Sequence, residues 1–179
     1  MEKYISFLRG INVGGHHILK MNDLKKIHTE MGHRNVNTYL QSGNVIYETS
    51  VKSRGKLTSI LEKNYQKAFG FHIDVITCKL LELQKIVKEC PFPINKNVES
   101  KLINIIQLSD IPDSELASVL IKHGGPEEKH IVGNVLYVYY KEGSGRSKFN
   151  LNYIERTLNV KGTARNWNTI TRLIELAQE

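Results

Sequence analysis

The stretch Leu-Arg-Gly-Ile-Asn-Val-Gly-Gly, residues 8–15, decides how the fold is interpreted, because an apolar segment gives way there to a glycine-rich loop. A short apolar run that ends at a glycine is typical of a buried strand, which we expect over 4–8. Gly10, Gly14 and Gly15 can adopt positive φ angles and turn successive backbone N–H groups toward an anion. Arg9, at the mouth of the loop, can add two further hydrogen bonds to the same anion.

The glycine spacing also resembles that of a nucleotide-binding loop. Gly10 and Gly15 are separated like the two glycines of a Walker A loop, but His16 and His17 stand where that loop has its lysine and its hydroxyl residue. We therefore exclude an ATPase loop of this class. Two interpretations remain: the loop binds an anion, or its glycines only form a turn while Arg9 pairs with a carboxylate.

The composition is that of a globular protein. With 179 residues, 40% of them hydrophobic, the chain can build one large domain or two small ones. Cys78 and Cys90 are too few for a disulfide framework or a four-cysteine metal site, and a reducing cytosol fits best. No segment has the length of a membrane span or the pattern of a signal peptide. We expect a soluble, cytoplasmic protein.

The formal net charge of +7 is concentrated in the first half of the chain. Residues 1–90 hold 14 Lys and Arg against 8 Asp and Glu, a net of +6, whereas residues 91–179 hold 11 against 10, a net of +1. An anion attracted by charge alone is therefore expected on the first half.

The first half has the element order β-α-β-β-α-β. Asn22 is expected to cap a helix that Gly32 ends, and Gly70 is expected to end a second helix. The predicted elements are a strand over 4–8, a helix over 22–31, strands over 36–40 and 45–47 joined by a turn at 42–44, a helix over 57–68 and a strand over 72–78.

The second half repeats this order after a linker at 79–98, which holds a helix over 80–87 and the break Pro91-Phe92-Pro93. Its predicted elements are a strand over 102–108, a helix over 112–123 capped by Gly124, a hairpin of 128–132 and 135–140 about Gly133-Asn134, a helix over 148–158, a strand over 162–165 and a C-terminal helix with Ile170, Leu173, Ile174 and Ala177 on one face.

A short sequence echo supports an internal duplication. Gly-Asn-Val-Ile-Tyr at 43–47 recurs as Gly-Asn-Val-Leu-Tyr at 133–137, at the same place in the element order. We therefore predict an α+β fold of two ferredoxin-like (α–β plait) βαββαβ modules in tandem. Residues 1–78 form the first module, and residues 99–179 form the second together with the C-terminal helix.

This topology predicts a first candidate site. In a plait with strand order 4-1-3-2, the loop after strand one lies beside the turn that joins strands two and three. Backbone amides, neutral side-chain amides and one arginine suit a phosphate or carboxylate. The predicted ligand-binding residues are Arg9, Asn12, Gly14 and Gly15 from the loop and Gln41, Ser42 and Asn44 from the turn.

A second candidate site is predicted in the second module. The segment 143–148, Gly-Ser-Gly-Arg-Ser-Lys, is expected to lead into a helix N-terminus, where backbone donors favour an anion. The last strand ends at the same side of the sheet, and Asn168 is placed to cap the final helix. The predicted ligand-binding residues are Gly145, Arg146, Lys148, Arg165, Asn166 and Trp167. Trp167 either closes the core or stacks on a planar group.

Four ordered motifs, at 8–15, 41–45, 143–148 and 165–167, together resemble a bacterial family known as domain of unknown function 1697. The resemblance covers essentially the whole chain and implies a cytosolic protein with two plait-like halves. It implies no activity. Members often carry a Lys or Arg and then Asn after the paired glycines, where this chain has His16-His17. If that cation contacts a ligand, binding here is expected to be weaker or to depend on pH.

Other kinds of site find less support. Four histidines are close in sequence, but no neighbouring Cys or carboxylate pattern accompanies them, and we predict no metal site. They are His16, His17, His28 and His33. Tyr137 and Tyr139 stand where the RNA-recognition motif, which shares the plait, carries base-stacking aromatics, but the rest of its signature is missing. No pattern of a nucleophile with its base is recognisable, so no catalytic residue is assigned.

We therefore expect a protein that binds a phosphate-bearing small molecule, such as a nucleotide, in a cleft between the modules. This version requires the two candidate sites to face each other. Nucleic-acid binding through the basic first module is the alternative, and an enzyme of unassigned reaction stays open. No cofactor and no membrane partner are predicted.

Overall fold

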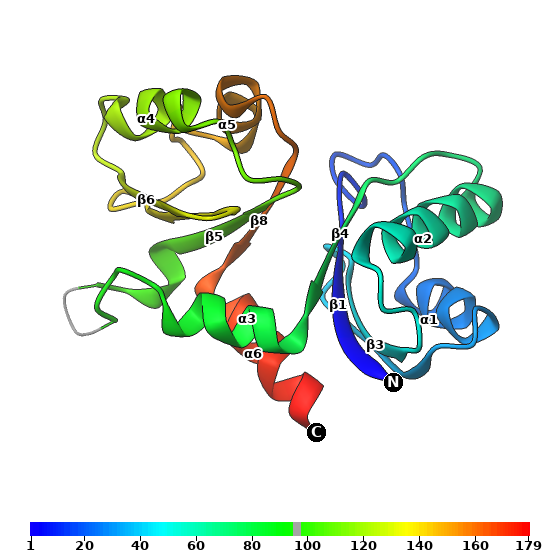
Figure 1. Ribbon diagram of the computed structural model, residues 1–179. Helices are drawn as coiled ribbons and strands as arrows, with labels where there is room; N and C mark the ends of the chain where they lie inside the picture. The colour runs from blue at the N-terminus through cyan, green and yellow to red at the C-terminus, as the bar shows by residue number, and fades with distance from the viewer. Residues whose placement is uncertain (95–97) are drawn as a thin grey trace. The chain divides into compact units, whose positions relative to one another are not determined.

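The structure is a computed structural model that describes residues 1–94 and 98–179 (Figure 1). Within these residues the chain forms two four-stranded antiparallel sheets and six α-helices, the mixed α+β architecture that the sequence predicts. The chain divides into two compact units, of which the first comprises Met1–Gln84 with Leu173–Glu179 and the second comprises Lys85–Arg172. The predicted linker over 79–98 includes positions 95–97, which lie outside the described residues.

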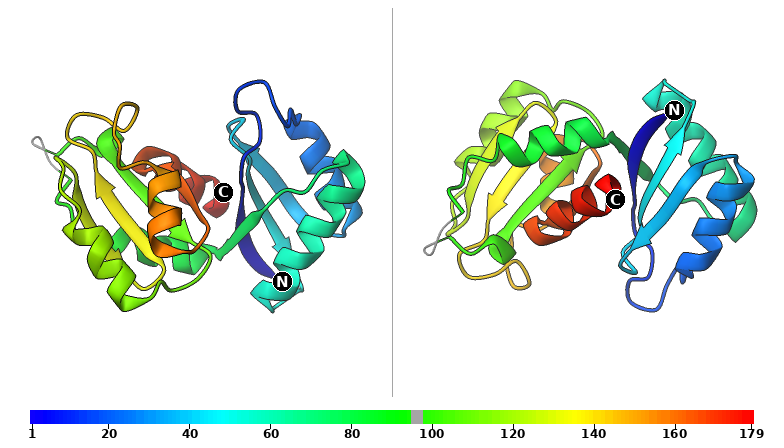
Figure 2. Two further views of the ribbon diagram at one scale, coloured as in Figure 1. Left: turned by 90° about the horizontal axis from the view of Figure 1, so that it is seen from above. Right: turned by 90° about the horizontal axis from the view of Figure 1, so that it is seen from below.

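The first unit is one sheet with two helices on a single face (Figure 2). Its elements are β1 (Glu2–Leu8), α1 (Met21–Glu30), β2 (Arg34–Tyr39), β3 (Asn44–Thr49), α2 (Arg54–Phe69) and β4 (Val75–Lys79), followed by α3 (Leu80–Lys88). The strand order is β2-β3-β1-β4, and every neighbouring pair is antiparallel. This is the order 4-1-3-2 expected from the sequence.

The second unit has the same strand order. Its elements are the 3-10 helix η1 (Ser100–Leu102), β5 (Ile103–Leu108), α4 (Ser114–Lys122), β6 (Glu128–Val132), β7 (Val135–Tyr139), α5 (Leu151–Leu158), β8 (Gly162–Asn166) and α6 (Trp167–Gln178). The sheet runs β6-β7-β5-β8, again with antiparallel neighbours. α4 and α5 lie together on one face of this sheet (Figure 1). Among the described residues, no helix is long and apolar enough to cross a membrane.

Several helices begin or end at other residues than predicted. α1 starts at Met21, after Lys20 in the N-cap position, so Asn22 is not its cap. α5 starts at Leu151 instead of Lys148, because the Asn150 side chain accepts a hydrogen bond from Tyr153 N and caps the helix there. The segment 143–148 therefore does not lead directly into a helix N-terminus.

The ends of α4 and α6 also differ from the prediction, because other residues than expected cap them. α4 begins after Asp113, whose carboxylate accepts hydrogen bonds from the backbone N–H groups of Glu115 and Leu116. It ends at Lys122 with His123 in the C-cap position, one residue earlier than the predicted end at His123 with Gly124 as the cap. At α6, Asn166 Oδ1 accepts a hydrogen bond from Thr169 N, whereas Asn168 Oδ1 accepts one from Ser100. Asn166, and not Asn168, thus caps the final helix.

The core of the first unit lies between the sheet and its two helices. Leu24 of α1 and Leu57 and Leu61 of α2 are fully buried in one cluster with Tyr4 and Leu8 of β1. The apolar residues of α2 recur at the three- and four-residue spacing of a helix face, which is why the sequence predicts this helix well. Gly70 ends it with a φ of 80°, in the left-handed region that a helix C-cap often requires.

A buried polar cluster lies inside this core. The Nδ1 atoms of His28 and His33 are 2.9 Å apart, and His28 Nε2 bonds the hydroxyl of Tyr65. His33 stacks on Tyr47, whose hydroxyl lies 2.7 Å from Ser6 Oγ. Burial, aided by the neighbouring His33, lowers the pKa of His28 from 6.5 to about 3. The folded protein therefore keeps His28 neutral.

The first unit should lose stability in mild acid because of this histidine. Below pH 6.5 the unfolded chain protonates His28, but the folded chain does so only near pH 3. Between these values, each pH unit of acidification should remove up to about 1.4 kcal/mol from the unfolding free energy. Urea unfolding at several pH values measures this slope. Glutamine at position 28 can form hydrogen bonds but does not titrate, so in His28→Gln the unfolding free energy should depend on pH less steeply, by about 1.4 kcal/mol per pH unit. An unchanged pH dependence would show that His28 is not the group responsible.

The core of the second unit lies on the face of its sheet that α4 and α5 cover. Ile106 and Leu108 of β5 and Leu136 and Val138 of β7 pack in one cluster with residues of α4 and α5. Tyr137, between the last two, points to the opposite face, where its hydroxyl donates a hydrogen bond to Ile86 O of α3.

The sequence echo at 43–47 and 133–137 is out of register in the structure. Tyr4 pairs with Tyr47, which faces the helices of its unit. The corresponding pair of the second unit is Asn104 with Val138, so Tyr137 is offset by one residue from the place of Tyr47. Because side chains alternate along a strand, one residue of offset puts the two tyrosines on opposite faces of their sheets. The topology repeats, but the echo does not superpose residue on residue.

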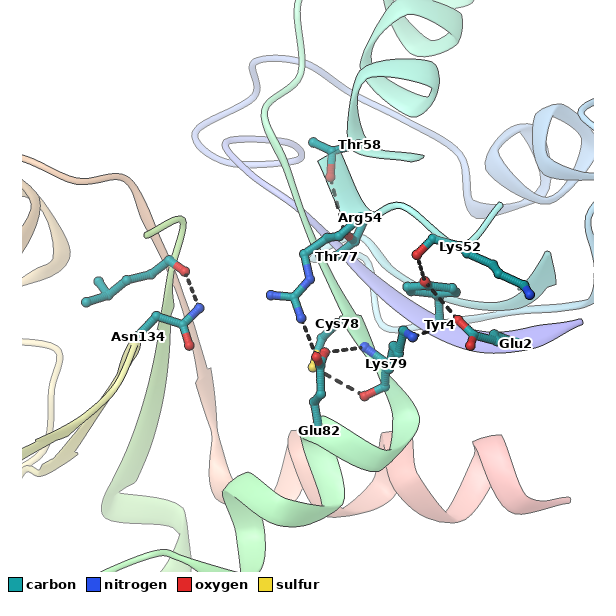
Figure 3. A network of polar contacts seen from close by, with 11 residues as sticks. Glu2, Tyr4, Lys52, Arg54, Thr58, Thr77, Cys78, Lys79, Glu82 and Asn134 are labelled. Atoms are coloured by element: carbon teal, nitrogen blue, oxygen red, sulfur yellow. Dashed lines mark hydrogen bonds and ion pairs between the residues drawn. The ribbon is translucent and has the colours of Figure 1, made fainter. Parts of the chain in front are cut away.

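A polar network fastens the start of α3 to the first unit (Figure 3). Arg54, at the start of α2, pairs with Glu82, whose other carboxylate oxygen accepts a hydrogen bond from Lys79 N at 2.9 Å. The ammonium of Lys79 lies 2.8 Å from the carboxylate of Glu2. These contacts join the first strand, the second helix and α3, which accords with the division between the units at Gln84 and Lys85.

Candidate functional site

The glycine-rich loop after β1 folds into a small hairpin. Asn12 N donates to His17 O, and His16 N donates to Val13 O at 3.0 Å. Gly14 and Gly15 occupy the two central positions of this turn with φ angles of 59° and 78°. Positive φ at both positions is what a tight two-residue hairpin turn requires, so the turn itself explains this glycine pair.

Asn12 fastens the hairpin to its surroundings with its side-chain amide. Its Oδ1 accepts a hydrogen bond from Leu19 N at 2.7 Å, and its Nδ2 donates to Leu19 O and, at 2.7 Å, to Gln41 O. The loop therefore lies beside the turn that joins β2 and β3, as the topology predicts. The amide of Asn12 is used for this attachment.

The turn at 40–43 is held in the same way. Asn44 is fully buried, and its Nδ2 donates to Tyr39 O and to Ser42 Oγ. Gly43 has a φ of 77°, and a Cβ atom there would lie 2.6 Å from Ile11 Cδ1 and 2.8 Å from Leu8 Cβ. Only glycine fits this position.

Arg9 takes part in an ion pair within the first unit. Its guanidinium lies 3.3 Å from Asp74 Oδ2, and its backbone N donates to Asp74 O. Asp74 also accepts a hydrogen bond from His72 Nε2 at 3.1 Å. This is the second of the two interpretations of the loop, in which the glycines form a turn and Arg9 pairs with a carboxylate.

Replacing Gly43 by alanine should destabilise the protein by several kcal/mol, since the new methyl group would overlap Ile11 and Leu8 and φ would be strained. Gly70→Ala is the matched control: its φ of 80° is equally unfavourable, but nothing lies within 4 Å of the added Cβ, so the cost should be only the roughly 1–2 kcal/mol of the left-handed backbone. Denaturant unfolding measures both. If both variants lose the same unfolding free energy, the close approach of Leu8 and Ile11 to Gly43 does not contribute to the cost of the substitution.

The second unit contains a cavity of about 400 Å³, here called the loop pocket. Its lining comes from the segment before β6, His123–Glu127, and from the segment after β7, namely Tyr140–Gly143 and Arg146–Phe149. Glu128 pairs with Tyr139 across the β6–β7 ladder, so both segments leave the sheet at the same end. The antiparallel hairpin thus creates the pocket.

Two cations line the loop pocket without a carboxylate partner. Arg146 and Lys148 are exposed, and within the described part of the chain neither forms an ion pair. The acidic residues of the pocket are Glu127, which accepts a hydrogen bond from Ser147 Oγ, and Glu142. The pocket therefore offers two cations for an incoming anion, beside carboxylates that favour a ligand with hydrogen-bond donors.

An aromatic wall supports the pocket. Tyr153 OH lies 2.9 Å from His123 Nδ1, and the two rings are 4.6 Å apart. Phe149 is buried behind them, and Tyr140 OH donates to Phe149 O at 2.8 Å. Lys129 donates to His123 O, which fixes the backbone at the pocket edge. Burial raises the pKa of Tyr140 to about 12, so this hydroxyl stays protonated as a donor.

The other predicted residues of the second site do not line this pocket. Arg165 follows Ala164, which packs in the core beneath α4 and α5, so Arg165 points to the opposite face of the sheet. There its guanidinium donates to Thr163 Oγ1 and Ala164 O, and burial lowers its pKa to about 10. Asn166 caps α6, and neither Trp167 nor Gly145 lines the pocket.

The predicted sites therefore separate into three groups. In the first unit, Asn12 and Asn44 hold the backbone, and Arg9 pairs with Asp74. In the second unit, Arg146 and Lys148 share a pocket. The residues of 165–167 lie outside it.

The sequence matches, over residues 1–137, a family described as "Protein of unknown function (DUF1697)". The chain belongs to this family. A solved structure of a conserved bacterial protein from Streptococcus pneumoniae has the same fold, with a TM-score of 0.73 at 21% sequence identity over 98% of each chain. None of the curated proteins matches the sequence. The matched region ends before the loop pocket segment 140–149, so the family assignment does not depend on Arg146 or Lys148.

Two other arrangements of this DUF1697 chain bear on the sequence predictions. Tyr137 is buried and hydrogen-bonded to α3, and Tyr139 lies 5.9 Å from the ring of Phe92, so these tyrosines pack instead of forming an open platform for RNA bases. Glu62, His72 and Asp74 each offer an atom that could bind a metal ion, and these atoms lie within 4.8 Å of one another. However, the Asp74 carboxylate is paired with Arg9, and the Glu62 carboxylate accepts a hydrogen bond from Val75 N.

The aromatic wall formed by His123 and Tyr153 is not apparent from the sequence. His123 and Tyr153 are separated by 30 positions and come from different elements, and no local motif joins them. The predicted topology does indicate where the pocket lies. Gly124-Gly125-Pro126 precedes the first strand of the predicted hairpin and Gly143-Ser144-Gly145 follows the second strand, so the two loops lie at the same end of the hairpin.

Proposed function

We propose that the protein binds a phosphate-bearing small molecule in the loop pocket of the second unit. The observation that carries this proposal is the pair Arg146 and Lys148, which line a cavity of about 400 Å³ and have no ion-pair partner among the described residues. We also infer that each unit is a ferredoxin-like module, from the strand order shared by the two sheets.

The chemistry of the pocket supports a phosphate more than a simple carboxylate. The arginine presents a planar fork of donors that matches two phosphate oxygens, and the lysine supplies a second, movable charge. Ser147 is held by its bonds to Glu127 and Phe149 N, so the backbone between the two cations is fixed. A fixed backbone at this point lowers the entropy that is lost when the two side chains close on a ligand.

Isothermal titration with inorganic phosphate and with ribose 5-phosphate tests the proposal. Arg146→Ala and Lys148→Ala should each weaken binding at least tenfold, because each removes one charge-assisted contact. Lys122→Ala is the matched control: it removes one exposed positive charge from the neighbouring helix without touching the pocket lining, and its affinity should stay within twofold of the wild type. Binding that is absent, or equally weakened in all three variants, would rule the proposal out.

Nucleic-acid binding by the first unit is the second candidate. It rests on exposed lysines such as Lys56, Lys63 and Lys67 along α2. The first unit as a whole, Met1–Gln84 with Leu173–Glu179, holds 12 Lys and Arg against 9 Asp and Glu, a net of +3. On this account a single-stranded oligonucleotide should bind with an affinity that falls steeply as the salt concentration rises. The double variant Lys63→Ala with Lys67→Ala should make the slope of log affinity against log salt concentration shallower by about two. A fluorescence-anisotropy titration at several salt concentrations decides it. No binding at low salt, or a slope unchanged in the double variant, would remove this candidate.

A further inference from the structure

A second cavity adjoins the loop pocket. This cavity, here called the helix pocket, has a volume of about 520 Å³ and continues along α5. It shares His123 and Lys148 with the loop pocket, and the rest of its lining is Asn150, Asn152, Tyr153 and Arg156. The two cavities therefore border each other at His123 and Lys148.

The combined size argues against a lone phosphate. Pockets for small molecules and cofactors typically measure roughly 300–1,000 Å³, and a phosphate ion fills only a small part of such a volume. The loop pocket and the helix pocket measure about 400 and 520 Å³. If the phosphate of a ligand binds to Arg146 and Lys148, the rest of that ligand can therefore occupy the helix pocket.

The helix pocket differs chemically from the loop pocket. It is lined by no carboxylate. Besides His123 and Lys148 on the shared border, its polar groups are the amides of Asn150 and Asn152, the hydroxyl of Tyr153 and the guanidinium of Arg156. Asn152 is exposed at the start of α5, and no hydrogen bond involves its side chain within the residues that the structure describes. An amide offers both a donor and an acceptor, which is how proteins commonly read the edge of a nucleobase.

The same pocket also has flat surfaces. The Arg156 guanidinium lies over the Tyr153 ring at 6.0 Å from its centroid, and the His123 ring lies beside Tyr153 on the shared border. The bond between Tyr153 OH and His123 Nδ1 fixes both rings. Planar groups held in place in this way suit the stacking of a heterocycle.

We propose that the two pockets together bind a nucleoside monophosphate, with its phosphate on Arg146 and Lys148 and its base in the helix pocket against Tyr153 and Asn152. This inference rests on the proposed function, because the phosphate contacts are those of the loop pocket. It adds the ligand class and the residues that recognise the base.

Titration of the full chain with ribose 5-phosphate and with AMP, GMP, CMP and UMP separates the two proposals. At least one nucleotide should bind ten times more tightly than ribose 5-phosphate. Asn152→Ala should remove most of that advantage and leave the affinity for ribose 5-phosphate unchanged, because the phosphate contacts remain. Ser118→Ala, an exposed polar-to-alanine change on α4, is the control and should alter neither affinity.

The outcomes are distinguishable. If ribose 5-phosphate binds and depends on Arg146, but no nucleotide binds more tightly, the base site is wrong and the phosphate site stands. If a nucleotide binds more tightly and Asn152→Ala does not reduce its advantage, the assignment of the base to the helix pocket is overturned. If neither sugar phosphate nor nucleotide binds, both proposals fail. Thermal unfolding of each variant verifies that these exposed substitutions leave the fold intact.

Discussion

The peptide at Gly43 lies directly against Leu8 and Ile11, and the glycine loop of the first unit is arranged around this close approach. Leu8 N donates to Gly43 O at 2.8 Å, which extends the β1–β3 ladder into the turn. With the turn this close, Asn12 reaches Gln41 O and fixes the hairpin above it. A side chain at Gly43 would separate these parts.

The two glycine-rich loops of the chain consequently differ in what their residues do. In the first, the glycines form a two-residue turn, the asparagines bond backbone groups and the arginine pairs with a carboxylate. In the second, Ser147 is bonded to Glu127, but the cations on either side of it form no ion pair among the described residues. Groups that the fold does not use are the ones available to a ligand, and this contrast is the reason for proposing a ligand site in the second unit.

Much of the fold was predictable because it follows from local patterns. Apolar spacing located the helices, and the glycines at 70 and 133 ended a helix and formed a hairpin turn as expected. The helix starts were less predictable, since several polar residues compete for each cap: Asn150 displaced the start of α5 by three positions. The echo at 43–47 and 133–137 misled for a physical reason, because strand register is set by pairing partners and not by similarity of letters.

The candidate site was predictable in part. The topology brought the loop at 9–15 beside the turn at 41–44, and it brought the ends of β7 and β8 to one side of their sheet. The topology does not determine to which face of the sheet each side chain points. Arg165 and Arg146 lie at the same end of the sheet, but alternation along β8 sends Arg165 to the other face, and the strand boundary that decides this is not visible in the sequence.

The last residues of α6 have a consequence for the order of events during synthesis. Leu173–Glu179 follow the whole second unit in the chain, yet they belong to the first, where Lys3 donates a hydrogen bond to Ala177 O. A ribosome produces Met1–Gln84 first, but that unit lacks its final segment until every residue of the second has been translated. The first unit therefore becomes complete only after the second unit has been translated, although its first 84 residues are made before it.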